Sequence, residues 1–182
     1  AYPDTYLGGL AGYAESCSFE NVSTDVSIYY YREKTNNFEY VINIGGVIGK
    51  AYKSLFKYCD NYASVYVTFG TRSTEYYKSG VVFVGGITGD EYGSKYICCA
   101  NHSPVLYASV KGSCNTSNNH GIRIGGIVGN TGYATLIQSC CNNAQSLTGK
   151  SSISSYNETI RIGGICATSY GSIFNCYSST ID

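Results

Sequence analysis

Carboxylic acids are the first side chains to consider as catalysts, because glycosidases place two of them roughly 5 to 10 Å apart around the bond that they cleave. The acids of this chain are scattered, and only Asp90 together with Asp60 or Glu91 forms a conceivable pair. Five similar repeats, described below, also offer no unique cleft. The sequence therefore predicts a protein that is not an enzyme, with a polysaccharide-degrading enzyme as the least favoured alternative.

Cysteine and histidine are the next candidates, because they bind metals such as zinc. The chain has nine cysteines and two histidines, His102 and His120. Cysteines are adjacent at Cys98-Cys99 and at Cys140-Cys141, whereas zinc sites use Cys-x2-Cys or paired histidines. We therefore predict no metal site and no cofactor, and we expect inward cysteines to pack as small apolar side chains. A disulfide framework is the alternative, and the odd number leaves at least one thiol unpaired within the chain.

Glycine-rich segments can bind phosphate when a helix follows them, but no helical period follows any such segment here. Instead, a glycine doublet after an apolar residue occurs five times, which favours a repeated backbone corner. The doublets are Gly8-Gly9, Gly45-Gly46, Gly85-Gly86, Gly125-Gly126 and Gly163-Gly164. Their first glycines are 37, 40, 40 and 38 residues apart.

A second motif follows most of the doublets at a similar distance. It has the form Cys-x-Asn, and its residues are Cys59 and Asn61, Cys99 and Asn101, Cys141 and Asn143, and the imperfect copy at Cys176. We predict that the asparagines stack as a hydrogen-bonded ladder and that the cysteines stack beside them. Around these motifs each unit shows three short β-like runs, and we interpret 70–79 and 111–121 as variable polar loops.

Repeats of this kind stack on one another, because a single unit cannot cover its apolar face. The predicted fold is all-β, a parallel β-helix or solenoid of about five coils with a period of about 37 to 40 residues. We expect one domain over 1–182, with units at about 6–43, 44–83, 84–123, 124–161 and 162–182. One coil or two coils per unit remain possible, since about 40 residues fit either arrangement.

Tyrosine is the residue type most suited to binding, since 20 are present. Tyr52, Tyr92, Tyr133 and Tyr170 each follow a doublet by seven or eight residues, so stacking would align them. Such a column either packs a turn or forms a platform for sugar rings or a partner protein. Tyr76 and Tyr77 and the cluster at 29–31 both lie in predicted loops, which makes them better candidates for contact.

The charge pattern argues against several functions. Lys plus Arg and Asp plus Glu both number 12, and charged residues make up 13% of the chain. This balance favours neither nucleic acid nor an acidic membrane surface as a partner. No apolar run is long enough to cross a bilayer, and residue 1 does not start a signal peptide.

The repeats resemble the GLUG-motif repeats of bacterial surface proteins. The closest segments are Tyr6 to Tyr13 and Ile162 to Ile165 with Ser172 to Tyr177. The resemblance covers all five units and implies a β-helical stack in a large exported, often adhesin-like protein, without catalytic residues to carry over. Longer loops between units and abundant tyrosine depart from that family.

Together these patterns predict a non-catalytic repeat scaffold or adhesive module of an exported bacterial cell-surface protein. The alternative is a carbohydrate-binding module that uses exposed tyrosines. We expect a host or cell-surface glycan or protein as partner, together with neighbouring domains of the same, longer chain. The expected location is extracellular or at the cell surface, with the signal or anchor outside this sequence.

Overall fold

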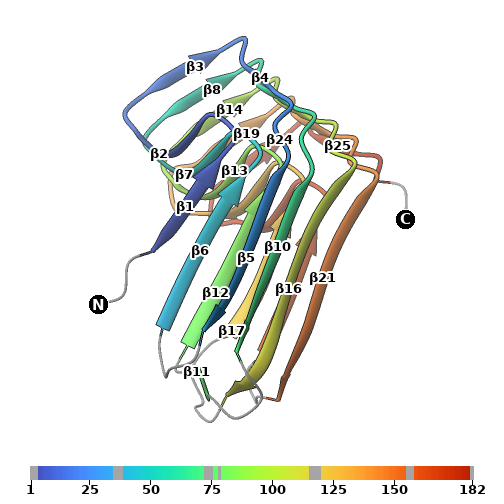
Figure 1. Ribbon diagram of the computed structural model, residues 1–182. Helices are drawn as coiled ribbons and strands as arrows, with labels where there is room; N and C mark the ends of the chain where they lie inside the picture. Colours follow the sequence, from blue (N-terminus) through green and yellow to red (C-terminus); the bar gives the residue numbers. More distant parts are fainter. Residues whose placement is uncertain are drawn as a thin grey trace.

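The computed structural model describes residues 4–34, 39–71, 76–77, 79–114, 120–154 and 158–180. All regular structure in these residues is β-strand, wound into coils that lie one upon another (Figure 1). Every strand pairing is parallel. The prediction of an all-β parallel solenoid is therefore confirmed. Within the described residues, no helix is long and apolar enough to cross a membrane.

The strands form five parallel sheets that run along the stack. Sheet 1 contains β1 (Thr5–Gly8), β6 (Glu39–Gly45), β12 (Ser79–Gly85), β17 (His120–Gly125) and β22 (Glu158–Gly163). Sheet 2 contains β2 (Ala11–Glu15), β7 (Ile48–Tyr52), β13 (Thr88–Tyr92), β18 (Val128–Thr131) and β23 (Cys166–Thr168). Sheet 3 contains β3 (Ser18–Glu20), β8 (Leu55–Lys57), β14 (Lys95–Ile97), β19 (Leu136–Gln138) and β24 (Ser172–Phe174).

The remaining two sheets complete each coil. Sheet 4 contains β4 (Ser23–Thr24), β9 (Asp60–Asn61), β15 (Ala100–Asn101), β20 (Cys141–Asn142) and β25 (Tyr177–Ser178). Sheet 5 contains β5 (Ile28–Lys34), β10 (Val65–Thr71), β16 (Val105–Cys114) and β21 (Ser146–Ser154), and the short β11 (Tyr76–Tyr77) pairs with the end of β16. Four coils thus have strands in all five sheets, and the described part of the fifth coil has strands in sheets 1 to 4.

One sequence unit makes one coil, which settles the alternative that the period left open. The first glycines of the five doublets are register partners along sheet 1. A coil has five strands rather than the three that we predicted, because several strands of sheets 3 and 4 are only two or three residues long. Such short segments show too little alternation to be recognised in a sequence. The predicted loops are also partly wrong, since β10 includes Gly70 and β16 continues to Cys114.

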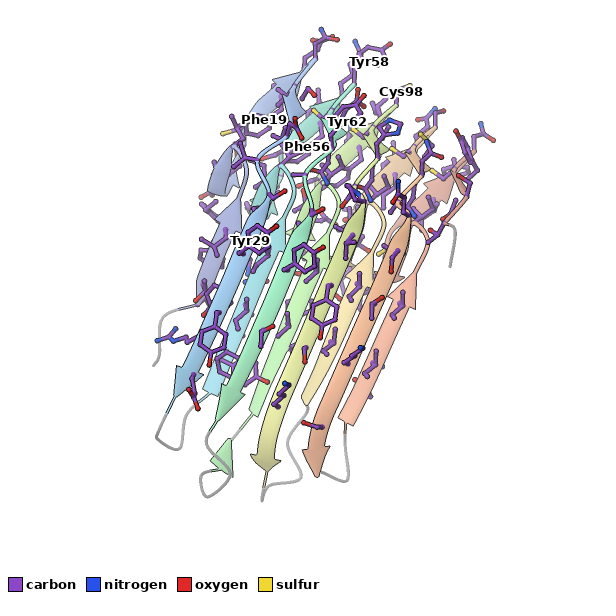
Figure 2. The ribbon with its side chains drawn as sticks, turned by 45° about the vertical axis from the view of Figure 1, so that its right-hand side comes forward. Phe19, Tyr29, Phe56, Tyr58, Tyr62 and Cys98 are labelled. Carbon is purple, nitrogen blue, oxygen red and sulfur yellow. The ribbon has the colours of Figure 1, made fainter. Side chains whose placement is uncertain are left out.

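The cross-section has two lobes with separate cores. The arm consists of sheets 1 and 5 packed face to face, and its core includes Ile42, Ile44, Val65 and Val67. Sheets 2, 3 and 4 enclose the head, whose core includes the stacked rings of Phe19, Phe56 and Tyr96. Both lobes are visible in Figure 1, and Figure 2 shows Phe19 and Phe56 in the head and Tyr29 on the arm. In the longer strands alternate side chains are buried, which explains why apolar residues recur there at every second position.

The glycine doublets and the asparagines meet at the junction of the two lobes, which we call the neck. Asn61 donates from Nδ2 to Oδ1 of Asn101 at 2.9 Å, and Asn101 donates in the same way to Asn142 at 2.8 Å. A Cβ atom on Gly86 would lie 2.3 Å from Cγ of Asn101 and 2.1 Å from the carbonyl oxygen of Gly126. In coils 2 to 4 the second glycine of the doublet therefore leaves the space that the asparagine ladder fills.

The predicted asparagine ladder is confirmed for Asn61 and Asn101 but wrong for Asn143. The third rung is Asn142, whereas Asn143 points outward and lies 3.5 Å from the His102 ring. For the same reason Cys141 is not in the inward cysteine column, and Cys140 takes its place beside Cys99. Coil 4 carries one extra residue between β18 and β19, so the register offset changes from 40 to 41 residues there. Coil 4 contains the Cys-x-Asn pattern twice, as Cys140 with Asn142 and as Cys141 with Asn143, and the first copy lies in the columns.

Candidate functional site

The carboxyl groups that could have formed a catalytic pair lie apart. Asp90 and Glu91 are neighbours in β13 and so point to opposite faces of sheet 2. Asp90 faces outward, where its carboxylate lies 3.2 Å from Nζ of Lys50 and accepts a hydrogen bond from Asn130. Glu91 is buried in the head. Asp60 belongs to sheet 4. Neither predicted pairing, Asp90 with Glu91 or Asp90 with Asp60, forms a two-carboxylate site on one face.

Glu91 is the one buried acid among the residues that the structure describes, with 2% of its surface exposed. Its carboxylate accepts hydrogen bonds from the backbone N–H groups of Ser94 at 2.9 Å and Gly132 at 3.3 Å, and from the Thr135 hydroxyl. Burial raises the pKa of Glu91 to about 7, because the charged form loses water, although these donors favour the charged form. Gly132 and Thr135 flank the extra residue of coil 4. Glu91 therefore holds the enlarged turn in place.

The backbone amides at the glycine doublets are engaged in stacking. The N–H of Gly46 donates to the Gly85 carbonyl at 3.1 Å, and the N–H groups of Val47 and Ile48 both donate to the Ile87 carbonyl. A phosphate would need these donors free. The doublets are therefore corners of the coil, as the sequence predicted.

Metal-binding residues do not converge in the part of the chain that the structure describes. No group of three or more His, Cys, Asp or Glu side chains there is close enough to hold a metal ion. His102 stacks on Tyr62, with ring centroids 4.9 Å apart. This contact gives His102 a packing role on the surface.

The predicted tyrosine column lies at the outer end of sheet 2, and we call it the tip strip: Tyr52, Tyr92, Tyr133 and Tyr170. The rings of Tyr52 and Tyr92 are stacked, with centroids 5.6 Å apart and planes at 13°. Tyr133 and Tyr170 are tilted by 41° at a centroid distance of 5.3 Å. Tyr92, Tyr133 and Tyr170 are 45%, 65% and 58% exposed. The tip strip is therefore a row of partly exposed rings along the stack.

The tip strip forms two pairs rather than one column with even spacing. Gly132 occupies the next place above Tyr92, because its N–H donates to the Glu91 carbonyl at 2.9 Å. A Cβ at Gly132 would lie 2.5 Å from the Tyr92 ring, so no larger residue fits there. Tyr133 is consequently displaced by one residue. The extra residue in coil 4 thus interrupts the tip strip, whereas the asparagine and cysteine columns continue through this coil.

A second tyrosine surface lies on the outer side of sheet 5, and we call it the tyrosine face: Tyr29, Tyr31, Tyr66 and Tyr107. Tyr29, Tyr66 and Tyr107 are register partners on β5, β10 and β16. The rings of Tyr29 and Tyr66 are 5.1 Å apart and nearly parallel at 5°. Tyr29 and Tyr31 are 75% and 72% exposed, and Figure 2 shows Tyr29 projecting from the arm.

The sequence predicts only part of the tyrosine face. The loop predicted for 29–31 is wrong, because these residues lie within β5 and the middle one, Tyr30, packs against the arm core. Tyr66 and Tyr107 were missed, although the alternation of Val65, Tyr66 and Val67 signals an outward ring. Tyr76 and Tyr77 form the backbone strand β11, but their side chains lie outside the described part of the molecule.

Comparison with protein-family models, with curated proteins and with solved structures gives no match to this chain. The similarity of its repeats to GLUG motifs therefore stays a prediction.

Proposed function

We propose that this chain is a non-catalytic repeat scaffold of an exported cell-surface protein, and that its tyrosine face makes adhesive contacts with a partner protein. The observation that carries the proposal is that inward and outward columns of side chains have different roles. Inward columns such as Asn61, Asn101 and Asn142 hold coil to coil, while the outward column of sheet 5 presents tyrosine rings to solvent.

The chemistry of the tyrosine face suits protein contact. Tyrosine offers a large apolar ring and a polar hydroxyl, and it loses little conformational entropy on binding. The ring of Tyr66 lies between those of Tyr29 and Tyr107, which restricts its movement. Lys150 adds a positive charge 5.9 Å from the Tyr107 ring. A rigid aromatic surface on a parallel sheet is the kind of surface that supports an interface core.

The separation of the acids also supports a non-catalytic role. Asp90 is neutralised by Lys50, and Glu91 is held inside the head by three hydrogen bonds. The extracellular location rests on the similarity to GLUG repeats alone.

The test is a binding experiment with fluorescently labelled protein on immobilised extracellular-matrix proteins and on a glycan array. The variant Tyr29→Thr with Tyr31→Thr removes the two most exposed rings and keeps β-forming residues in β5. Tyr58→Asn is the matched control, because Tyr58 is 47% exposed and its positive φ of 54° suits asparagine. We expect the double variant to lose protein binding at least tenfold while the control retains it. Equal loss in both, or in neither, would contradict the proposal.

A carbohydrate-binding module is the second candidate, favoured by the exposure of Tyr133 and Tyr170. Sugars pack against the flat face of an aromatic ring, and the 41° tilt leaves these two faces only partly covered. In contrast, Tyr52 and Tyr92 cover one another. Glycan binding that is lost in Tyr133→Ala and Tyr170→Ala, yet kept in the variant of the tyrosine face, would favour this candidate.

A further inference from the structure

Four cysteines stack in one inward column of the head: Cys59, Cys99, Cys140 and Cys176. The N–H of Cys99 donates to Sγ of Cys140 at 3.4 Å, and the N–H of Cys140 donates to Sγ of Cys176 at 3.4 Å. The thiols of Cys59, Cys99 and Cys176 also donate toward a carbonyl of the preceding coil, as Cys176 does to Ile137 at 3.6 Å. The thiol of Cys140 donates to the Gln138 carbonyl of its own coil. The sulfurs of Cys140 and Cys176 therefore each lie against the cysteine of the coil before them. All four are free thiols in this structure.

The column meets the geometric requirement for disulfides between neighbouring coils. Disulfide-bonded residues have Cα atoms roughly 4.4 to 6.8 Å apart, and adjacent strands of a sheet are about 4.8 Å apart. The residues that follow Cys99, Cys140 and Cys176 are register partners along sheet 4, so the cysteines also lie in register. No strand would have to slide to bring two of these sulfurs together.

The other cysteines with described side chains lack such a neighbour. Cys141 is the register partner of Ala100 and Tyr177, and Cys166 is the partner of Val128. Cys98 lies beside Ser139 in the next coil, and Cys17 lies beside Ser54. Stacking of cysteine on cysteine is therefore confined to the column.

We propose that the column is a site of oxidative cross-linking, in which a small disulfide such as oxidised glutathione joins Cys140 to Cys176. Cys176 is the entry point because it is partly exposed, while the other three are fully buried.

The chemistry proceeds by two thiol–disulfide exchanges. The thiolate of Cys176 attacks a sulfur of oxidised glutathione, forming a mixed disulfide and releasing one glutathione thiolate. The thiolate of Cys140 then attacks Sγ of Cys176, forming the protein disulfide and releasing the second glutathione. Two protein thiols are oxidised and one glutathione disulfide is reduced to two thiols, so electrons and protons balance. Burial raises the pKa of Cys176, so the first exchange is slow at neutral pH and faster in alkaline buffer.

The consequence is a covalent link between coils 4 and 5. The bond joins residues 36 positions apart, and closing such a loop restricts the unfolded chain. We expect the midpoint of thermal unfolding to rise by several degrees after oxidation and to return to its starting value after reduction. A stack exported to an oxidising environment would gain stability in this way.

The experiment treats the folded chain with oxidised glutathione at pH 8 and maps the bonds by tryptic digestion without reduction. Cleavage at Arg123, Lys150 and Arg161 separates Cys140 and Cys141 in one peptide from Cys166 and Cys176 in another. The variant Cys141→Ser with Cys166→Ser makes the assignment unambiguous, because each peptide then holds one cysteine. We expect these peptides to be joined, with the loss of two hydrogen atoms, in this variant and in the unaltered chain.

The variant Cys176→Ser is the negative control, in which we expect Cys140 to stay reduced. If Cys176→Ser does not fold, the map of the Cys141→Ser, Cys166→Ser variant alone decides the matter. A mixed disulfide that persists at Cys176 without reaching Cys140, or a bond between Cys99 and Cys140, would overturn the proposal. So would a cross-link that forms only in urea, because the folded stack would then not be its template.

Discussion

Glu91 makes the stability of this solenoid sensitive to pH. Its pKa is raised from 4.5 to about 7 by burial, so the folded state binds the proton more tightly than the unfolded state. The contribution of Glu91 to the free energy of unfolding is therefore largest below about pH 4.5. It decreases as the pH rises and is lost above about pH 7. Each unit of pKa corresponds to about 1.4 kcal/mol, so the loss is about 3 kcal/mol.

The replacement Glu91→Gln removes the charge and nearly keeps the shape. One amide oxygen can accept from Gly132 and Thr135 as the carboxylate does, while the N–H of Ser94 loses its acceptor. Protonated glutamic acid has the same limitation, because one of its oxygens becomes a donor. We therefore expect the variant and the unaltered chain to be similarly stable at pH 5, and the variant to be more stable by about 2 to 3 kcal/mol at pH 8.

Urea unfolding at pH 5, 6, 7 and 8 measures the free energy of unfolding directly, and equal m values show that the same structure unfolds. Glu20→Gln is the control, because the Glu20 side chain is 52% exposed in its ion pair with Lys57. It should leave the pH profile unchanged. If Glu91→Gln shows the same fall in stability between pH 5 and pH 8 as the unaltered chain, the reasoning about its burial is wrong.

Three further changes test the packing of the neck and head. Asn101→Ala should destabilise the chain by about 3 kcal/mol or more, because the Asn61 side-chain amide and the Ser103 N–H lose their acceptor and the Asn142 side-chain oxygen loses a donor. Asn143→Ala, on the outside, should change chemical-denaturation midpoints little. Gly86→Ala should abolish folding or lower the thermal midpoint strongly, because its Cβ would overlap Asn101; normal circular dichroism and melting would contradict this account. Ile127→Asp should give insoluble protein, since it buries a carboxylate in the head, and a soluble variant with an unchanged melting point would refute the assigned orientation.

The sequence was sufficient to predict the stacking and the class of fold. A glycine doublet weakens an ordinary strand, so its fivefold recurrence at a nearly constant period indicated a corner shared by stacked units. The structure gives the two glycines different tasks. The first approaches the backbone three residues later, as Gly45 does to the Ile48 carbonyl, and the second makes room for an asparagine. Gly86 and Asn101 are 15 residues apart in the chain, so the fit between them is visible only in the folded structure.

Residue columns were less predictable than the period. Counting from one cysteine motif to the next gives 42 residues between Cys99 and Cys141, but the register offset in sheet 4 is 41. A single extra residue between β18 and β19 is absorbed by the turn that Glu91 holds. The segment Cys140-Cys141-Asn142-Asn143 fits the Cys-x-Asn pattern at two overlapping positions, so the sequence alone did not decide between them, and the choice of Cys141 and Asn143 was wrong.

The amino-acid sequence by itself determined that this chain repeats, that its repeats are β-structure and that they must stack, because periodic apolar faces have no other cover. Tertiary structure alone decided the two lobes, the partners in each column and the tyrosines that face solvent. Those features depend on the path of the backbone at each corner, where one residue more or less moves every following side chain to the opposite face until a turn restores the register.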